Sequence, residues 1–353
     1  GGGLYRLDSD GTVHLAQDIY TGTASSNPAD FTLFDGRLFF VATGAAGREL
    51  YTLDTDGTVR QAADINPGTA SSNPLMLTEF NDKLFLSATG SNGRELYVIN
   101  RGGTASLVAD INPGAADSDP SEFVAFDGNL YFVATNASGR TLYRQRSSGA
   151  SDPIGVALGE GVTDPRDLTE FNGRLYFSAL DSADGRELFA MSIPKKNGPE
   201  SVVMVANIDG TSSNSSPGEF QVFGDALYFA ATTENGRELF RLDSSSNLAE
   251  ADVAAGASSS SPSGFTEFNS ELYFAASVGG QRGLFRIDTS SSTLAAVQVP
   301  LPVNVTLPEN VGFQIASGAM YFAADGPVGR ELYRLDATGS VHFVVDVNTG
   351  AAG

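Results

Sequence analysis

The chain has 353 residues, of which 41% are hydrophobic and 10% aromatic, so it can bury a substantial core and does not belong to the disordered class. Its 42 acidic and 21 basic residues give a formal charge of −21, which opposes binding to phosphate backbones and to anionic lipid. The sequence has no apolar run of about 18 residues and no cysteine. We therefore expect no nucleic-acid partner and no direct membrane insertion.

The first 22 residues have the pattern of half a repeat. Gly1-Gly2-Gly3 lacks the basic and hydrophobic character of a signal segment, so we expect any targeting segment to lie outside this chain. Leu4 to Asp8 and Thr12 to Ile19 then have the apolar positions of two strands. An isolated two-stranded hairpin is marginal in water. We expect this hairpin to complete a sheet, either beside the final repeat or in a neighbouring molecule.

A phrase of the form Leu-Tyr-Phe-x-Ala then recurs through the rest of the chain, at spacings of 45 to 52 residues. Its seven copies begin at Leu38, Leu84, Leu130, Leu175, Leu227, Leu272 and Met320. A proline precedes each copy by about ten residues, commonly after Ser-Ser-Asn or similar turn formers. A repeat of this length is typical of a β-propeller.

The second copy shows the strands expected within one repeat. Leu77 to Phe80, Leu84 to Ala88, Glu95 to Ile99 and Ala105 to Ile111 are apolar segments separated by turn residues. Their connections are too short for a crossover helix, so the sheets must be antiparallel. We predict an all-β fold, a single β-propeller domain over residues 1–353 with four-stranded antiparallel blades. Seven blades with a surplus hairpin are favoured, and the alternatives are eight blades with one incomplete or a segment of a longer array.

Two stretches depart from the repeat. Met191 to Ser201 is an insertion that holds Lys195 and Lys196, and Val297 to Pro308 replaces the usual Asp-Ile-Asn-Pro-Gly ending with a proline-rich stretch. Both are predicted to be loops at the rim of the propeller.

A second repeated phrase, Gly-Arg-Glu-Leu-(Tyr/Phe), carries a family resemblance. It begins at Gly47, Gly93, Gly185, Gly236 and Gly329, with variants at Gly139 and Gln281, and one copy continues into Asp-Thr-Asp-Gly-Thr at 54–58. In this the chain resembles the bacterial surface repeats with a Glu-Leu-Trp-x-x-Asp-Gly-Thr consensus, called hyalin-like, and more distantly the periplasmic Tol-Pal propellers. Tyr or Phe stands in place of Trp, and the full Asp-Gly-Thr occurs twice. The resemblance covers nearly the whole chain and implies a propeller on an exported protein, with no catalytic motif to transfer.

The arginine of this phrase is present in all seven copies, at Arg48, Arg94, Arg140, Arg186, Arg237, Arg282 and Arg330. A residue shared by every copy is usually required by the blade, whereas a single functional centre breaks the symmetry. We expect a structural ion pair or carbonyl contact, and binding of an anionic sugar is the alternative.

Aspartates at the turns are the metal-binding candidates. Asp8, Asp10, Asp54 and Asp56 lie on Asp-x-Asp-Gly turns, which resemble the start of a calcium loop. The later ligands of such a loop are absent, and Asp-Gly is a common hairpin turn. Aspartates after the fourth strand, such as Asp110 and Asp252, are expected to cap turns. We expect no required cofactor, with calcium as the alternative.

Other polar residues could form a site only if the fold brings them together. Glu79, Glu170 and Glu267 precede a phenylalanine in the predicted innermost strand and could line a channel or pair with arginines. The two histidines, His14 and His342, occupy matched positions in two copies. No nucleophile elbow, zinc motif or nucleotide-binding loop is present, so we predict that the chain is not an enzyme.

These observations lead to a functional expectation. The acidic repeat surface and the resemblance favour a secreted or cell-surface scaffold for adhesion, surface-layer or filament assembly, with protein or surface polysaccharide as partner and self-assembly as an option. A multivalent carbohydrate-binding propeller is the alternative, and a polysaccharide hydrolase or lyase the third. A fold by itself does not choose among such functions.

Overall fold

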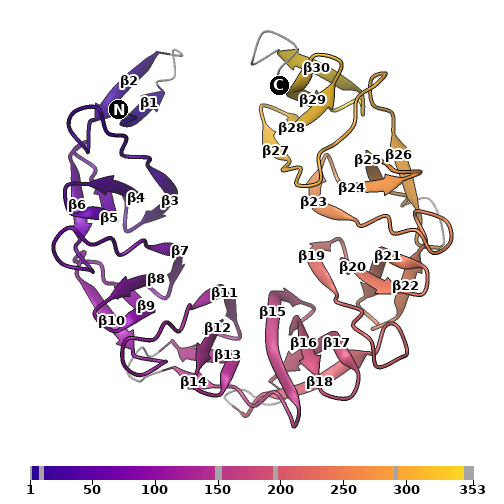
Figure 1. Cartoon of the computed structure of the whole chain (residues 1–353), viewed down its shortest axis with the longest axis horizontal. Coiled ribbons are helices and arrows are strands. Elements are labelled where there is room, and N and C mark those ends of the chain that lie inside the picture. The colour runs from indigo at the N-terminus through magenta and orange to yellow at the C-terminus, as the bar shows by residue number, and fades with distance from the viewer. Residues whose placement is uncertain (1, 8–11, 148–152, 194–197, 290–292, 346–353) are drawn as a thin grey trace. The chain divides into compact units, whose positions relative to one another are not determined.

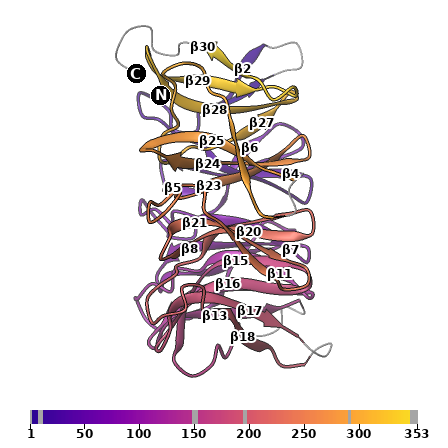
Figure 2. The same cartoon turned by 90° about the vertical axis from the view of Figure 1, so that its right-hand side faces the viewer.

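A computed structural model describes residues 2–7, 12–147, 153–193, 198–289 and 293–345, and every regular element in these ranges is a β-strand. The chain divides into two compact units, Gly1–Leu168 and Thr169–Gly353. Figures 1 and 2 show the strands of each unit gathered into separate small sheets. Within the described residues no helix has the length and apolar character needed to cross a membrane.

The first unit begins with a two-stranded sheet and continues with three four-stranded sheets. The two-stranded sheet consists of β1 (Leu4–Leu7) and β2 (Val13–Gln17). The second sheet consists of β3 (Ala29–Phe34), β4 (Arg37–Gly44), β5 (Gly47–Leu53) and β6 (Val59–Ala63). The third consists of β7 (Leu75–Phe80), β8 (Lys83–Gly90), β9 (Gly93–Ile99) and β10 (Ala105–Ala109). The fourth consists of β11 (Ser121–Phe126), β12 (Asn129–Asn136), β13 (Gly139–Arg146) and β14 (Ile154–Gly155).

The remaining strands form four more four-stranded sheets, and the boundary between the units falls within the first of these strands. The fifth sheet consists of β15 (Val162–Phe171), β16 (Arg174–Asp181), β17 (Gly185–Ser192) and β18 (Ser201–Ala206). The sixth consists of β19 (Gly218–Phe223), β20 (Ala226–Thr233), β21 (Gly236–Asp243) and β22 (Leu248–Ala251). The seventh consists of β23 (Ser263–Phe268), β24 (Glu271–Val278), β25 (Gln281–Ile287) and β26 (Ala296–Val299). The eighth consists of β27 (Gln314–Ala316), β28 (Ala319–Gly326), β29 (Gly329–Leu335) and β30 (Val341–Val345).

Local turn chemistry explains the antiparallel order of strands within each sheet. Between β7 and β8, Asn81 and Asp82 have φ angles of 49° and 59°, the pair of left-handed residues that a tight type I′ hairpin requires. Between β8 and β9, Gly93 has a φ of 85° at the next reversal. Each four-stranded sheet therefore follows the chain as a simple meander, as the sequence predicted.

The predicted burial of the second strand is confirmed. Phe40, Phe132 and Phe229 are fully buried at the centre of β4, β12 and β20. Within each unit the sheets pack face to face, because both faces of these strands are apolar. One cluster, for example, joins Phe34 and Phe39 of the second sheet to residues of the third sheet.

The first strand of a sheet commonly contains a β-bulge two residues after the repeat proline. The register against the second strand shifts there, and the bulge residue has a left-handed backbone. The φ angles are 56° at Asp30, 59° at Met76, 57° at Glu122, 62° at Asp167, 61° at Glu219 and 67° at Gly264. A bulge re-aims its side chain, and this sets the position of Glu219 in the site described below.

The repeated four-stranded antiparallel meanders are β-propeller blades, and the predicted fold class is confirmed. The described residues form eight sheets, the first of them two-stranded, so the alternative of eight blades with one incomplete describes them better than seven blades with a surplus hairpin. In the described chain β1 and β2 form a sheet of their own, and the expected joining of residues 4–19 to another sheet, beside the final repeat or in a neighbouring molecule, stays a prediction. The treatment of residues 1–353 as one domain stays a prediction.

Candidate functional site

The repeated arginines hold the loop that leads into the first strand. In four copies a guanidinium Nη1 atom donates a hydrogen bond to the carbonyl oxygen of the residue before the repeat proline. The pairs are Arg48 with Asn27 at 3.0 Å, Arg94 with Asn73 at 3.0 Å, Arg237 with Ser216 at 2.7 Å and Arg282 with Ser261 at 3.1 Å. The acceptor residues have φ angles of 41° to 46°, which are costly for residues other than glycine. Such carbonyl contacts are those expected of a structural arginine.

The glutamate of the same phrase is a second structural residue, and it was not among the residues expected from the sequence to have a role. Glu95 is fully buried in β9, where its Oε2 atom accepts hydrogen bonds from the Ser118 hydroxyl at 2.6 Å and from the Ile111 N–H at 2.9 Å. The same carboxylate-to-serine contact occurs at Glu49 with Ser72, Glu187 with Ser215 and Glu238 with Ser260. The signal that could have revealed it is the joint recurrence of the glutamate and of Ser-Ser before the proline. Two copies lack the glutamate and have Thr141 and Gly283 instead.

Two of the four calcium candidates, Asp54 and Asp56, belong to the described residues. Asp8 and Asp10 lie outside the described residues. Asp54 forms an ion pair with Arg60 at 2.7 Å, and Asp56 accepts the Thr58 N–H at 2.9 Å, a bond that lowers the pKa of Asp56. Among the residues that the structure describes, no group of three or more His, Asp or Glu side chains could hold a metal ion. Calcium binding stays a prediction.

The other polar candidates lie on separate sheets and turns. The expected turn caps are present, since Asp110, Asp252 and Asn207 accept the backbone N–H groups of Gly114, Gly256 and Gly210. Glu79, Glu170 and Glu267 are exposed on the first strands of three different sheets. His14 lies on β2, and His342 on β30 contacts Asp336 at 2.7 Å.

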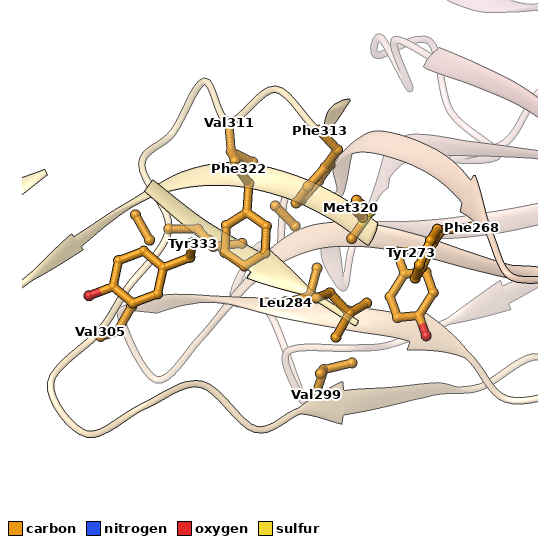
Figure 3. Close-up of a cluster of buried hydrophobic side chains, with 14 residues drawn as sticks. Phe268, Tyr273, Leu284, Val299, Val305, Val311, Phe313, Met320, Phe322 and Tyr333 are labelled. Atoms are coloured by element: carbon orange, nitrogen blue, oxygen red, sulfur yellow. The ribbon is translucent and has the colours of Figure 1, made fainter. Parts of the chain in front are cut away.

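A pocket occurs where the repeat is broken. It has a volume of about 670 Å³ and lies among the first strands of the sixth and seventh sheets and the loop before β27. This loop contains the proline-rich departure from the repeat. Its backbone keeps the bonds of the other copies, because the Leu307 N–H donates to Arg282 O at 2.9 Å, but its side chains differ. Figure 3 shows Val305, Val311 and Phe313 of the loop packed into the cluster that joins the last two sheets.

The pocket wall carries both signs of charge. Its charged residues are Glu219, Arg237, Arg282 and Glu309, and the remaining wall includes Ser261, Ser263, Ser277 and Asn310. Gly264 and Gly312 also line it, so no side chain fills the space at these two positions. A wall of this kind can bind the polar groups of a ligand through hydrogen bonds and ion pairs at once.

Arg282 is held in the pocket wall by several hydrogen bonds. Its Nη2 atom donates to Ser263 Oγ at 2.5 Å and to Ala275 O at 3.4 Å, while the buried Nε atom has no hydrogen-bond partner among the described residues. Burial lowers the pKa of Arg282, and the nearby carboxylates of Glu309 and Glu219 act in the opposite direction. The pocket therefore holds a fixed, partly desolvated cation beside two acids. Glu219 is itself positioned by an acceptor bond from the Gly264 N–H at 3.2 Å.

No protein-family model matches the sequence, and no curated protein matches it. The fold is similar to that of solved peptidases. A structure from work on two prolyl endopeptidases and on interdomain dynamics in their catalysis and specificity is 13% identical, with a TM-score of 0.55, and the match covers 92% of this chain and 50% of that chain. Oligopeptidase B from Leishmania major is 9% identical with a TM-score of 0.54, covering 92% and 49%. A post-proline cleaving enzyme from Rickettsia typhi is 9% identical with a TM-score of 0.56, covering 92% and 53%.

These similarities overturn the functional expectation. The chain spans about half the length of the peptidases that it matches, and at such low identity the likeness concerns the fold. The expected role as a scaffold for adhesion, surface-layer or filament assembly, and the carbohydrate alternatives beside it, are wrong in the light of peptidase neighbours. The expectation that residues 1–353 are not catalytic stays a prediction. The scaffold expectation failed because it rested on net charge and on the absence of catalytic motifs, which are properties of this stretch of sequence alone. Neither property reports on the kind of protein in which such a fold is used.

Proposed function

We propose that residues 1–353 are the peptide-binding half of a peptidase-type protein. The observation that carries the proposal is the match of 92% of this chain to about half of each of three peptidases. Bond cleavage is assigned to a part of such a protein other than these residues. The resemblance to hyalin-like repeats and secretion to the cell surface stay predictions beside it.

The pocket of the sixth and seventh sheets is the proposed contact point for a peptide. Arg282 and Arg237 are suited to a carboxylate or to peptide carbonyl groups, and Glu219 and Glu309 to an amine or to peptide N–H groups. A peptide segment presents all of these groups in close succession. The pocket volume of about 670 Å³ falls in the range of small-molecule and cofactor sites.

Binding of labelled peptides tests the proposal. Fluorescein-labelled octapeptides with a central proline, with free and with blocked ends, would be titrated with the chain and followed by fluorescence anisotropy. We expect saturable binding that weakens about tenfold in Glu309→Gln and Arg282→Lys. Arg48→Lys is the matched control, because Arg48 makes the same carbonyl bond outside the pocket.

Three outcomes would contradict the proposal. They are absence of binding to every peptide, unchanged affinity in both pocket variants, and an equal loss in Arg48→Lys. Peptide cleavage by residues 1–353 alone would contradict the assignment of cleavage to another part.

A further inference from the structure

The sheet of β1 and β2 has the features of a blade that lacks its first two strands. Tyr5 pairs with Leu15 just as Tyr51 of the third strand β5 pairs with Gln61 of the fourth strand β6. The backbone bonds agree, because the Gly2 N–H donates to Ser25 Oγ at 3.1 Å and the Arg48 N–H donates to Ser71 Oγ at 2.9 Å. In every four-stranded sheet the third strand is bonded to a second strand, whereas β1 is bonded only to β2 in the described chain.

Two residues of the neighbouring sheet are less buried than their counterparts, because the first sheet of the described chain lacks these two strands. Leu38 and Leu53, which pair between β4 and β5, are only partly buried. Their counterparts in the other six sheets are at most 3% exposed, at Leu84 and Ile99, Leu130 and Gln145, Leu175 and Met191, Leu227 and Leu242, Leu272 and Ile287, and Met320 and Leu335. The counterparts in the third sheet, Leu84 and Ile99, pack in one cluster with Phe34 and Phe39, which lie on the first and second strands of the sheet before. The sheet before Leu38 has no such strands.

An apolar groove remains at this place. It has a volume of about 390 Å³ and is lined mainly by Leu4, Tyr5, Leu15, Phe31, Leu38 and Leu53. Tyr5 is 56% exposed, Leu15 54% and Phe31 49%. Exposed apolar side chains beside an unpaired strand edge are the features that receive an added strand.

The other sheets show what fits such a place. In six of them the first strand ends in phenylalanine, a two-residue turn follows, and the second strand begins with one residue, an apolar residue and then Phe or Tyr. The eighth sheet has Ala316 in place of the phenylalanine. In six sheets this Phe pairs with the Phe or Tyr of the second strand, with ring centroids 5.8 to 6.3 Å apart. In the second sheet the pair is Phe34 and Phe39, which packs against Leu84 and Ile99 of the third sheet. Within the described residues the first sheet has no aromatic pair at the matching place beside Leu38.

We propose that the edge of β1 and the groove beside it bind a β-hairpin of this pattern from outside residues 1–353. The hairpin adds two antiparallel strands to β1 and places its aromatic pair over Leu38 and Leu53. The six phrases of this pattern in residues 1–353, and the variant before Met320, already lie in four-stranded sheets, so the hairpin is a further copy. The proposal is independent of peptide binding at the pocket of the second unit.

A peptide copied from the chain itself is the probe. Residues 71–92 hold β7, its turn and β8, and a synthetic peptide of this sequence would be added to the full chain. We expect saturable binding by calorimetry, a rise in Tm with peptide concentration, and slower amide hydrogen exchange in β1. The same peptide with Phe80→Ser and Phe85→Ser is expected to leave all three unchanged.

A matched pair of protein variants locates the binding. Leu15→Asp places a charge in the groove, whereas Leu107→Asp places the same charge at the equivalent, exposed position of β10 in a complete sheet. We expect Leu15→Asp to abolish the Tm response and Leu107→Asp to keep it, with both proteins folded by circular dichroism. If the peptide neither binds to the wild-type chain nor raises its Tm, the proposal is wrong. An equal response in Leu15→Asp also overturns it, because the peptide then binds elsewhere.

Discussion

The hydroxyl of Ser118 donates a hydrogen bond to Glu95 Oε2 at 2.6 Å, and this bond ties the third strand of one sheet to the loop that leads into the next. The two residues are 23 positions apart, and both are fully buried. A buried carboxylate is tolerated because it accepts bonds from a side chain and from the backbone of the loop. The contact recurs in four sheets, and each of these four helps to position the loop that leads into the following sheet.

Removing this carboxylate tests its role. Glu95→Ala is expected to lower the free energy of unfolding by about 3 kcal/mol, because the Ser118 hydroxyl and the Ile111 N–H are left buried without an acceptor. Chemical denaturation of the two proteins measures the difference. Thr141→Ala is the control, since Thr141 occupies the same repeat position and the change is expected to be small. Equal stability of the two variants would contradict a structural role for Glu95.

The same carboxylate predicts a pH dependence of stability. Burial raises the pKa of Glu95 above its ordinary value of 4.5, although its hydrogen bonds act in the opposite direction. Above about pH 4.5 the folded state therefore holds a proton that the unfolded state has released. The stabilisation from this group is present below pH 4.5 and is lost as the pH rises through the raised pKa.

The Glu95→Gln variant has no titrating carboxyl group at this position, so its stability is the reference for the wild type. Oε1 of Glu95 has no hydrogen-bond partner among the described residues, so an amide fits with its oxygen in the place of Oε2. We expect the stability of the wild type relative to Glu95→Gln to fall as the pH rises between about 4 and 8. Denaturation curves across this range measure it. A difference that is constant or that increases with pH would show that the raised pKa is wrong.

Truncation of a central aromatic residue tests the packing of a blade. Phe229→Ala is expected to cost about 3 to 5 kcal/mol of unfolding free energy, because Phe229 is fully buried between sheets. Leu33→Ala serves as the control, since Leu33 is 71% exposed and its loss is expected to change stability little. Denaturant titration compares both with the wild type. A neutral Phe229→Ala would mean that the sheets pack loosely.

Calcium gives a fourth prediction. We expect chelation and addition of calcium to leave Tm unchanged at moderate salt, because Asp54 is engaged by Arg60 and Asp56 by the Thr58 N–H. Differential scanning calorimetry with EDTA and with calcium measures it. A rise of many degrees on calcium addition, lost in a variant with Asp54→Asn and Asp56→Asn, would instead establish a site, since a ligand of the folded state stabilises by mass action.

The sequence by itself determined the architecture. The alternation of short apolar phrases with Gly and Asx turns leaves no room for helices, and turns such as Asn81 and Asp82 select tight hairpins through their own backbone preferences. Apolar runs such as that around Phe132 require cover on both faces, which the sheets supply by packing on one another. These features depend on residues close together in the chain, so they can be inferred without coordinates.

Only the tertiary structure decided which polar residues are structural and which line a pocket. Glutamate is a residue type usually found at the surface, and the burial of Glu95 depends on its contact with Ser118 in the next repeat. Glu219, Arg282 and Glu309 come from three repeats and face one pocket because a bulge, a missing glutamate at Gly283 and a rebuilt loop coincide there. Such a coincidence is a property of long-range packing. No local sequence pattern predicts it, because the bulge, Gly283 and the changed loop are each an ordinary variation of a repeat when taken alone.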